Sequence, residues 1–178
     1  DDCLTELQRL RSDAGTFGCL GNHEVYINAE QYVIDAGRRR DLRFLQRQRE
    51  TLRFGQSRLN LAGVEYQRLR KPYLVAAQSL QEEGAFNILL SHNPDVFPVA
   101  ARQGWNVTLA GHTHGGQVNV EILEQNLNLV RVFATPYVYG VYHQGPAAMY
   151  VTRGIGTVGV PARIGAPPEV ALIRLCAT

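Results

Sequence analysis

The sequence predicts an α/β protein built around an open sheet, most simply as one domain over residues 1–178. Two observations point to this class. Segments with helical spacing of apolar residues alternate along the chain with short apolar runs typical of strands. Three of these runs, residues 15–20, 86–90 and 106–110, lead directly into polar motifs. Because open α/β sheets bind ligands outside the carboxyl ends of their strands, we expect the three motifs to lie together.

The N-terminal part is expected to hold two helices around one strand. Leucines at helical spacing predict a short helix that ends near Ser12, and residues 15–20 form the first strand. Asn28, followed three positions later by Gln31, has the pattern of a capping box. This pattern predicts a helix over residues 28–37.

The next part is expected to be rich in strands. Strands are predicted over residues 42–45, 50–54 and 58–64, with a hairpin turn at 55–57 between the last two. Pro72 predicts the start of a helix that reaches about Glu83, because proline is tolerated at the first helical position.

From residue 86 onward the predicted order is strand, helix, strand and hairpin. The strands over 86–90 and 106–110 enclose a helix from about Pro94 to Gln103. Residues 137–144 and 148–152 are expected to pair around the turn at Gly145-Pro146, and residues 170–175 form a last strand.

The composition argues against some classes of function. Charged residues make up 19% of the chain and the formal net charge is +2, so we predict no nucleic-acid partner bound through its phosphates. The densest basic run is Arg38-Arg39-Arg40, with Arg43, Arg47 and Arg49 nearby. It alternates with apolar and acidic residues, which favours a solvated face over a phosphate-binding patch. A weak role in attracting an anionic substrate stays open.

The cysteines and the start of the chain indicate little about the compartment. Cys3, Cys19 and Cys176 are odd in number and lack zinc-like spacing, so neither a disulfide framework nor a thiolate metal site is expected. No apolar run approaches the roughly 20 residues that cross a bilayer. The chain begins with Asp1 rather than Met, which we interpret as the removal of an upstream segment.

The polar motifs hold four of the five histidines. They are Gly21-Asn22-His23-Glu24, Ser91-His92-Asn93-Pro94 and Gly111-His112-Thr113-His114-Gly115-Gly116-Gln117. Imidazole nitrogen and amide oxygen suit Mn, Fe, Zn or Ni ions. Asn22, His92 and His112 together supply three ligands for one such ion, and His114 could reach a second ion a short distance away.

Two neighbouring ions activate a bridging water and orient a phosphate for displacement. His23, next to the ligand Asn22, would then face the leaving group and donate a proton to it. Glu24 either orients His23 or caps the local backbone.

Each motif also has a simpler interpretation. A lone His92 at a strand end is more often a hydrogen-bonded surface histidine, and Asn22-His23 alone fits an ordinary turn. The two histidines of the glycine-bracketed loop reverse this balance, and the three motifs together favour metal binding. His143 is interpreted as non-catalytic. The remaining aromatic candidates either line a substrate groove or, more readily, pack in the core or hairpin: Trp105, Tyr137, Tyr139 and Tyr142.

The three motifs resemble the last three motifs of the calcineurin-like metallophosphoesterase superfamily. The segment from Arg153 to Glu169 further resembles the bacterial phosphodiesterase branch of that superfamily, which includes membrane-associated enzymes. The resemblance covers nearly the whole chain apart from residues 123–135. It implies a four-layer α/β/β/α sandwich with a dinuclear metal centre at the strand ends.

The resemblance also implies a role for each residue of the motifs. Asn22, His92 and His112 would hold the second metal, His114 would serve the first, and His23 would assist the leaving group. The family's first two motifs, Asp-x-His and Gly-Asp-x-x-Asp, are not found in this sequence. We therefore interpret the chain as N-terminally incomplete, the C-terminal part of a larger enzyme. Such a piece is expected to expose sheet edge and apolar surface.

The expected function of the intact protein is metal-dependent hydrolysis of a phosphoester, either a phosphodiester or a pyrophosphate linkage. The expected cofactors are two divalent ions, chosen from Mn, Fe, Zn and Ni, and the expected partner is a small-molecule or lipid-linked substrate. A catalytically incomplete metal-binding or scaffold domain is the alternative. The expected localisation is cytoplasmic or membrane-associated, the latter through a segment upstream of Asp1.

Overall fold

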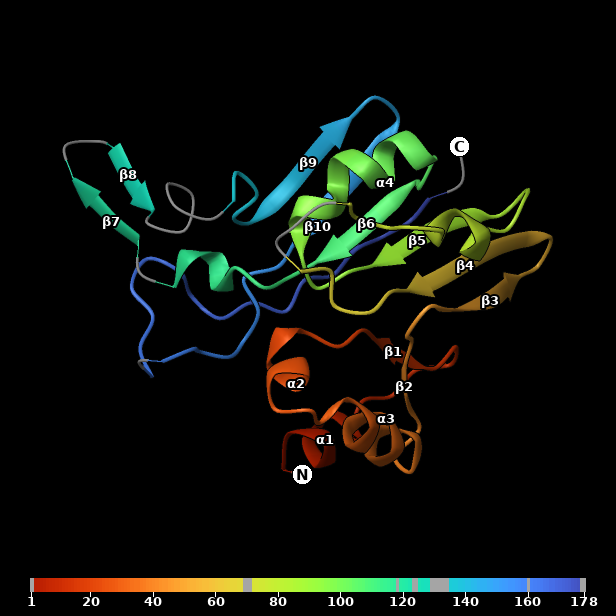
Figure 1. Ribbon diagram of the computed structural model, residues 1–178, viewed down its shortest axis with the longest axis horizontal. Coiled ribbons are helices and arrows are strands. Elements are labelled where there is room, and N and C mark those ends of the chain that lie inside the picture. Colours follow the sequence, from red (N-terminus) through yellow and green to blue (C-terminus); the bar gives the residue numbers. More distant parts are fainter. Residues whose placement is uncertain are drawn as a thin grey trace.

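The central element of the fold is a mixed sheet of six strands in the order β3-β4-β5-β6-β10-β9 (Figure 1). The structure, a computed structural model, describes residues 2–68, 72–117, 119–122, 125–128, 135–159 and 161–176. The six strands are β3 (Gln48–Phe54), β4 (Ser57–Gly63), β5 (Phe86–Leu90), β6 (Val107–Ala110), β9 (Gly140–Gln144) and β10 (Ala147–Val151). The four inner strands are parallel to one another, and the antiparallel strands β3 and β9 form the edges.

A smaller parallel sheet joins β1 (Thr16–Gly18) to β2 (Leu42–Phe44). Helix α3 (Glu30–Arg38) packs on β2 so closely that a Cβ atom at Gly37 would lie 2.6 Å from the Phe44 ring. Helices α1 (Asp2–Leu7) and α2 (Asn22–Tyr26) lie beside α3 in the lower part of Figure 1. A separate antiparallel pair is formed by β7 (Asn119–Ile122) and β8 (Gln125–Asn128).

The two faces of the large sheet bury different cores. Leu61 and Ile88 face the small sheet, where they share a cluster with Leu45 and the partly buried Phe17. The residues that follow them in their strands point the other way, because side chains alternate along a strand. These are Ala62 and Leu89, which pack with Val96, Ala100 and Trp105 in a second cluster.

Helix α4 (Phe97–Gln103) covers this second face, and it is preceded by a 3-10 turn, η2 (Pro94–Val96). The order through the molecule is therefore helices, small sheet, large sheet and helix, as Figure 1 shows from bottom to top. This order confirms the α/β/β/α arrangement that the sequence resemblance implied. The single domain over residues 1–178 stays a prediction.

Two predicted elements are wrong. The helix expected from Pro72 to Glu83 is reduced to a short 3-10 turn, η1 (Ala77–Leu80), because Leu74 and Ala76 adopt left-handed backbone angles with φ of 55° and 59°. The strand expected over residues 170–175 is not formed, and Val170 and Leu172 of this segment are almost fully exposed.

The capping box predicted at Asn28 is also wrong. Asn28 has a φ of 52°, and α3 begins two residues later, at Glu30, with no side-chain cap. The strand pairs 50–54 with 58–64 and 137–144 with 148–152 are confirmed, with bounds shifted by up to three residues. Residues Asp1 and most of 123–135 lie outside the described part of the chain.

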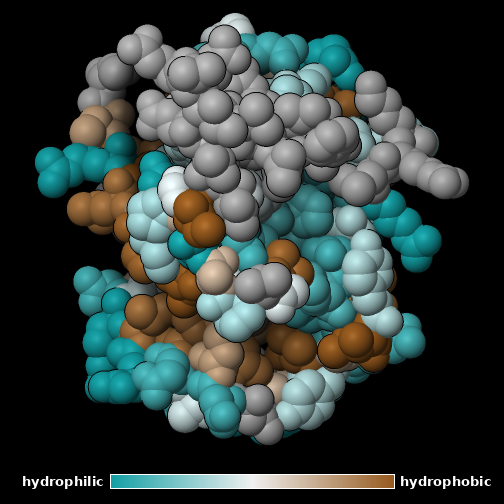
Figure 2. Space-filling model, turned by 90° about the vertical axis from the view of Figure 1, so that its left-hand side faces the viewer, coloured by the Kyte–Doolittle hydropathy of each residue, from teal (hydrophilic) through white to brown (hydrophobic). Residues whose placement is uncertain are grey.

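Apolar side chains are exposed on the N-terminal layers, as the sequence suggested. Leu10 and Ile27 are more than half exposed. Figure 2 shows apolar surface gathered in the lower half of one face, at the level of the helices α1 to α3 in Figure 1. Among the described residues, no helix has both the length and the apolar character that a membrane crossing requires.

Candidate metal centre

Three strand ends bring the predicted ligands together. His92 follows β5, His112 follows β6, and Asn22 begins α2 shortly after β1. Strands β5 and β6 are parallel neighbours, and the backbone N–H of Gly111 donates to the carbonyl of His92 at 3.3 Å. The two histidine loops are therefore held side by side at one edge of the sheet.

The donor atoms of Asn22 and His112 both lie close to one ring nitrogen of His92. The Nε2 atom of His92 lies 2.8 Å from Asn22 Oδ1 and 3.0 Å from His112 Nδ1. The two imidazole rings have centroids 4.8 Å apart. The contact between Asn22 and His92 spans 70 positions of sequence, so the fold, not local sequence, creates it.

The chemistry of this donor set fits a cation. A proton on His92 Nε2 can point well toward only one of the two neighbouring atoms, Asn22 Oδ1 and His112 Nδ1. If Nε2 instead carries a lone pair, that lone pair faces the carbonyl oxygen of Asn22, and two acceptors then oppose each other. Two ligand atoms that each lie about 2.1 Å from one ion are about 3 Å apart at a right angle, which is the spacing found here. The same three atoms can thus all act as donors to one ion.

The third donor of this cluster is an amide oxygen. Within the part of the chain that the structure describes, no group of three or more His, Cys, Asp or Glu side chains is placed to hold a metal ion. Asn22 is therefore needed to complete the set with His92 and His112.

The electrostatics keep both imidazoles neutral at neutral pH. Burial lowers the pKa of His92 to about 4, with smaller contributions from the charges of His112, His114 and His23. Burial also lowers the pKa of His112, against the opposing effect of the Asp95 carboxylate. Neutral imidazole is the form that binds a metal ion, so the local environment favours the ligand state.

Gly21 leaves the space that the His92 ring occupies. A Cβ atom at position 21 would lie 2.7 Å from His92 Cε1, a distance that real side chains do not tolerate. The Gly21 N–H donates to Glu24 Oε2 at 2.9 Å, so Glu24 caps the start of α2. This confirms the backbone-capping alternative for Glu24.

We expect Gly21→Ala to displace the His92 ring. The added methyl group should destabilise the protein by about 1–3 kcal/mol, as overpacking does, and weaken Mn²⁺ binding about tenfold because His92 leaves its position. Thermal denaturation and Mn²⁺ titration measure the two effects. Gly111→Ala is the matched control, because its Cβ atom would lie 3.8 Å from Thr152 Cγ2, an ordinary contact. Equal effects of the two substitutions would contradict the steric argument.

The other two predicted site residues lie near this cluster but make different contacts. His114 directs Nδ1 to the carbonyl of Gly156 at 3.2 Å and has a φ of 53°. His23 is exposed in α2, with its ring 6.4 Å from that of Tyr26. Both are close enough for their charges to lower the pKa of His92.

The sequence argument missed an aromatic wall beside the cluster. The ring of the buried Tyr66 lies 5.9 Å from the His92 ring and 6.3 Å from the His112 ring. Burial, and then its contact with Tyr26, raises the pKa of the Tyr66 phenol to about 12. Tyr66 follows β4, the parallel neighbour of β5, so the same strand-end rule that selected His92 could have found it.

The remaining aromatic candidates are mostly packing residues. Trp105 is 1% exposed in the core under α4, and the rings of Tyr137 and Tyr142 pack edge to face, which confirms the packing interpretation. Tyr139 is 42% exposed and lies under the guanidinium group of Arg153. His143 is exposed on the edge strand β9.

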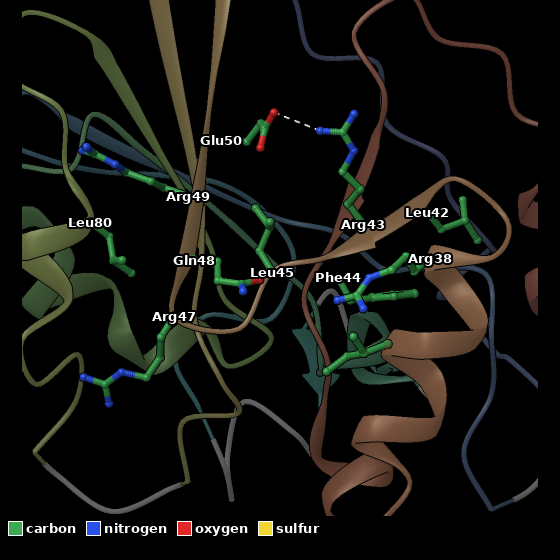
Figure 3. A pocket seen from close by; sticks show the side chains of 11 residues that line it. Arg38, Leu42, Arg43, Phe44, Leu45, Arg47, Gln48, Arg49, Glu50 and Leu80 are labelled. Atoms are coloured by element: carbon green, nitrogen blue, oxygen red, sulfur yellow. Dashed lines mark hydrogen bonds and ion pairs between the residues drawn. The ribbon is translucent and has the colours of Figure 1, made fainter.

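The basic run behaves as a solvated face. Four of its arginines line a cavity of about 490 Å³ between α3, β2 and β3, whose lining also includes Phe44 and Leu45. Figure 3 shows that the guanidinium groups of Arg47 and Arg49 point away from those of Arg38 and Arg43. Arg43 pairs with Glu50 at 2.9 Å and Arg47 with Glu65 at 3.3 Å. These groups do not converge on one anion.

Curated proteins from several bacteria are similar to this chain. An uncharacterized metallophosphoesterase of Helicobacter pylori (strain J99) is 32% identical, over 97% of this chain and 45% of its own length. An uncharacterized metallophosphoesterase of Aquifex aeolicus is 30% identical, over 95% of this chain and 64% of its own length. The phosphodiesterase YaeI of Escherichia coli (strain K12) is 28% identical, over 95% of this chain and 61% of its own length. No family model and no solved structure matches.

The α/β/β/α fold is consistent with a calcineurin-like metallophosphoesterase architecture. These relatives, which are named metallophosphoesterases and a phosphodiesterase, support assignment of the chain to the calcineurin-like metallophosphoesterase superfamily. The chain spans 45% of the length of the Helicobacter relative.

Proposed function

We propose that the protein containing this chain hydrolyses a phosphoester with the help of bound divalent metal ions. The observation that carries the proposal is that Asn22 Oδ1 and His112 Nδ1 lie 2.8 Å and 3.0 Å from the same atom, His92 Nε2. The similarity to metallophosphoesterases and to a phosphodiesterase supports the same reaction class. A divalent ion, when bound, polarises the phosphoryl oxygen and lowers the pKa of a coordinated water.

The residues of the chain divide into three roles in this proposal. Asn22, His92 and His112 hold one ion, because their donors already converge. His114 is a ligand of a second ion, and His23, which is exposed beside the site, donates a proton to the leaving oxygen. The buried Tyr66 phenol stays protonated at neutral pH and walls the two imidazoles on one side.

The substrate proposed is a phosphodiester or a pyrophosphate, carried by a small molecule or a lipid-linked group. The name of the Escherichia coli relative, a phosphodiesterase, supports the diester. The ions are proposed from Mn, Fe, Zn and Ni, the metals that accept imidazole and amide ligands. A cytoplasmic or membrane-associated localisation stays a prediction.

The reaction is tested on the intact protein with bis(p-nitrophenyl) phosphate. Chelation should abolish turnover, and added Mn²⁺ should restore it. We expect Asn22→Ala to weaken Mn²⁺ binding by at least about tenfold and to lower turnover with it, because one of three converging donors is lost. Mn²⁺ binding without any turnover would support the alternative of a non-catalytic metal-binding domain. Unchanged turnover in Asn22→Ala would overturn the assignment of the site.

A further inference from the structure

Arg163 lies at the centre of a set of backbone carbonyl groups next to the His112–His114 turn. Its Nε–H donates to Gly156 O at 2.9 Å, and its Nη2 atom donates to Gly156 O and, at 2.9 Å, to Arg153 O. Its Nη1 atom donates to His114 O at 3.0 Å and to Ala166 O at 3.1 Å. Arg163 thereby joins four points of the chain, one of them 49 positions away.

These five contacts equal the number of N–H groups that a guanidinium carries. The five contacts go to four carbonyl oxygens, which fix the path of the backbone. The planar fork of arginine suits this task because its donors point in fixed directions, whereas a lysine offers a single point charge. The geometry indicates that Arg163 organises the loop between β10 and the C-terminal segment around the turn that carries His114.

The backbone of this turn needs such support. His112 and His114 both have left-handed φ angles, 74° and 53°, which are unfavourable for residues with a Cβ atom. The carbonyl of His114 accepts from Gln117 N at 3.1 Å as well as from Arg163. The bond from Arg163 therefore holds the peptide plane that follows His114, and with it the direction of the His114 side chain.

The same guanidinium also fixes the acceptor that the His114 ring uses. The Nδ1 atom of His114 lies 3.2 Å from Gly156 O, and Arg163 donates twice to that oxygen. A carbonyl oxygen can only accept, so this contact places the proton on Nδ1. The other ring nitrogen, Nε2, then keeps its lone pair. A histidine that binds a metal through one nitrogen commonly donates the other N–H to a backbone carbonyl in this way.

We propose that Arg163 is a positioning residue for His114, which holds both the backbone of the turn and the Gly156 carbonyl that selects the Nδ1–H tautomer. This inference rests on the proposed function only in giving His114 a role as a metal ligand. The orientation and the tautomer are properties of the metal-free protein.

The tautomer is read by long-range ¹H–¹⁵N NMR of the intact, metal-free protein with ¹⁵N-labelled histidine, with His114→Gln used to assign the signal. We expect the unmodified protein to show His114 protonated at Nδ1. Arg163→Ala should turn this signal into a mixture of both tautomers, while the signals of His92 and His112 stay unchanged. Arg163→Lys should preserve the Nδ1–H form in part, because it restores a cation with three donors. Arg174→Ala, which removes an exposed arginine of the C-terminal segment, is the control and should change nothing.

A second measurement follows Mn²⁺ binding by electron paramagnetic resonance. Loss of an outer-shell partner commonly weakens metal binding about 10- to 100-fold, and we expect Arg163→Ala to fall in this range. An unchanged His114 tautomer in Arg163→Ala would overturn the proposal. The proposal would also be overturned if both Arg163 variants lost the signals of His92 and His112 together with that of His114. Arg163 would then support the whole fold and not His114 in particular. Absence of phosphoester hydrolysis would count against the proposed function but would leave the tautomer result intact.

Discussion

His112→Ala is expected to lower the turnover of bis(p-nitrophenyl) phosphate by about 10³-fold in the intact protein. The expected size follows from the several kcal/mol that a bound ion contributes to a phosphoryl transition state, at about 1.4 kcal/mol for each factor of ten. His112 is one of three converging donors, and its Nδ1 atom lies 3.0 Å from His92 Nε2. Steady-state kinetics over a range of Mn²⁺ concentrations separates lost metal affinity from lost turnover at saturation.

The control for this substitution is His143→Ala. His143 is an exposed histidine on the edge strand β9, so its removal tests for a general effect of losing an imidazole. We expect its kinetics to match those of the unmodified protein. Comparable activity of His112→Ala and His143→Ala would contradict the placement of the metal centre at the ends of β5 and β6.

Trp105→Ala is expected to destabilise the protein by about 3–5 kcal/mol, the range found when a buried tryptophan or phenylalanine is truncated. Trp105 is 1% exposed and packs with Leu89, Val96 and Ala100 between the large sheet and α4. Truncation leaves a cavity that this tight core cannot fill. Because the chain has one tryptophan, denaturation should be followed by far-UV circular dichroism instead of tryptophan fluorescence.

Tyr32→Ala is the control for this core substitution. Tyr32 is an aromatic residue of α3 that is 54% exposed, and its removal should change stability by no more than about 0.5 kcal/mol. A loss below about 1 kcal/mol in Trp105→Ala would favour the groove interpretation of Trp105 over the core interpretation.

The sequence predicted that Asn22, His92 and His112 lie together, because each follows a predicted strand. Strand β5 was predicted with its bounds, Phe86–Leu90, and β6 within one residue, so the adjacency of His92 and His112 follows from parallel strand order. Asn22 also reaches this point, because the small sheet packs on the large one.

Other parts of the structure could not be predicted from local patterns. The segment after Pro72 has the composition of a helix, but left-handed angles at Leu74 and Ala76 end any helical path, and Leu74 is instead buried in the core. The role of Arg163 was missed because its partners are carbonyl groups, which every residue carries. Residues 170–175 look like a strand by composition, yet no neighbouring strand pairs with them in the described part of the chain.

The donor cluster joins the two sheets of the sandwich. Asn22 belongs to the layer of the small sheet, whereas His92 and His112 belong to the large one. A slide of one sheet along the other would change the spacing between Asn22 and His92 and leave that between His92 and His112 intact. Ligand distances in a metal site must hold to a few tenths of an ångström. The contacts of Phe17, Leu61 and Ile88 between the sheets therefore resist this sliding and keep Asn22 in place beside His92. Substitutions in this cluster can change metal affinity although none of the three residues is a ligand.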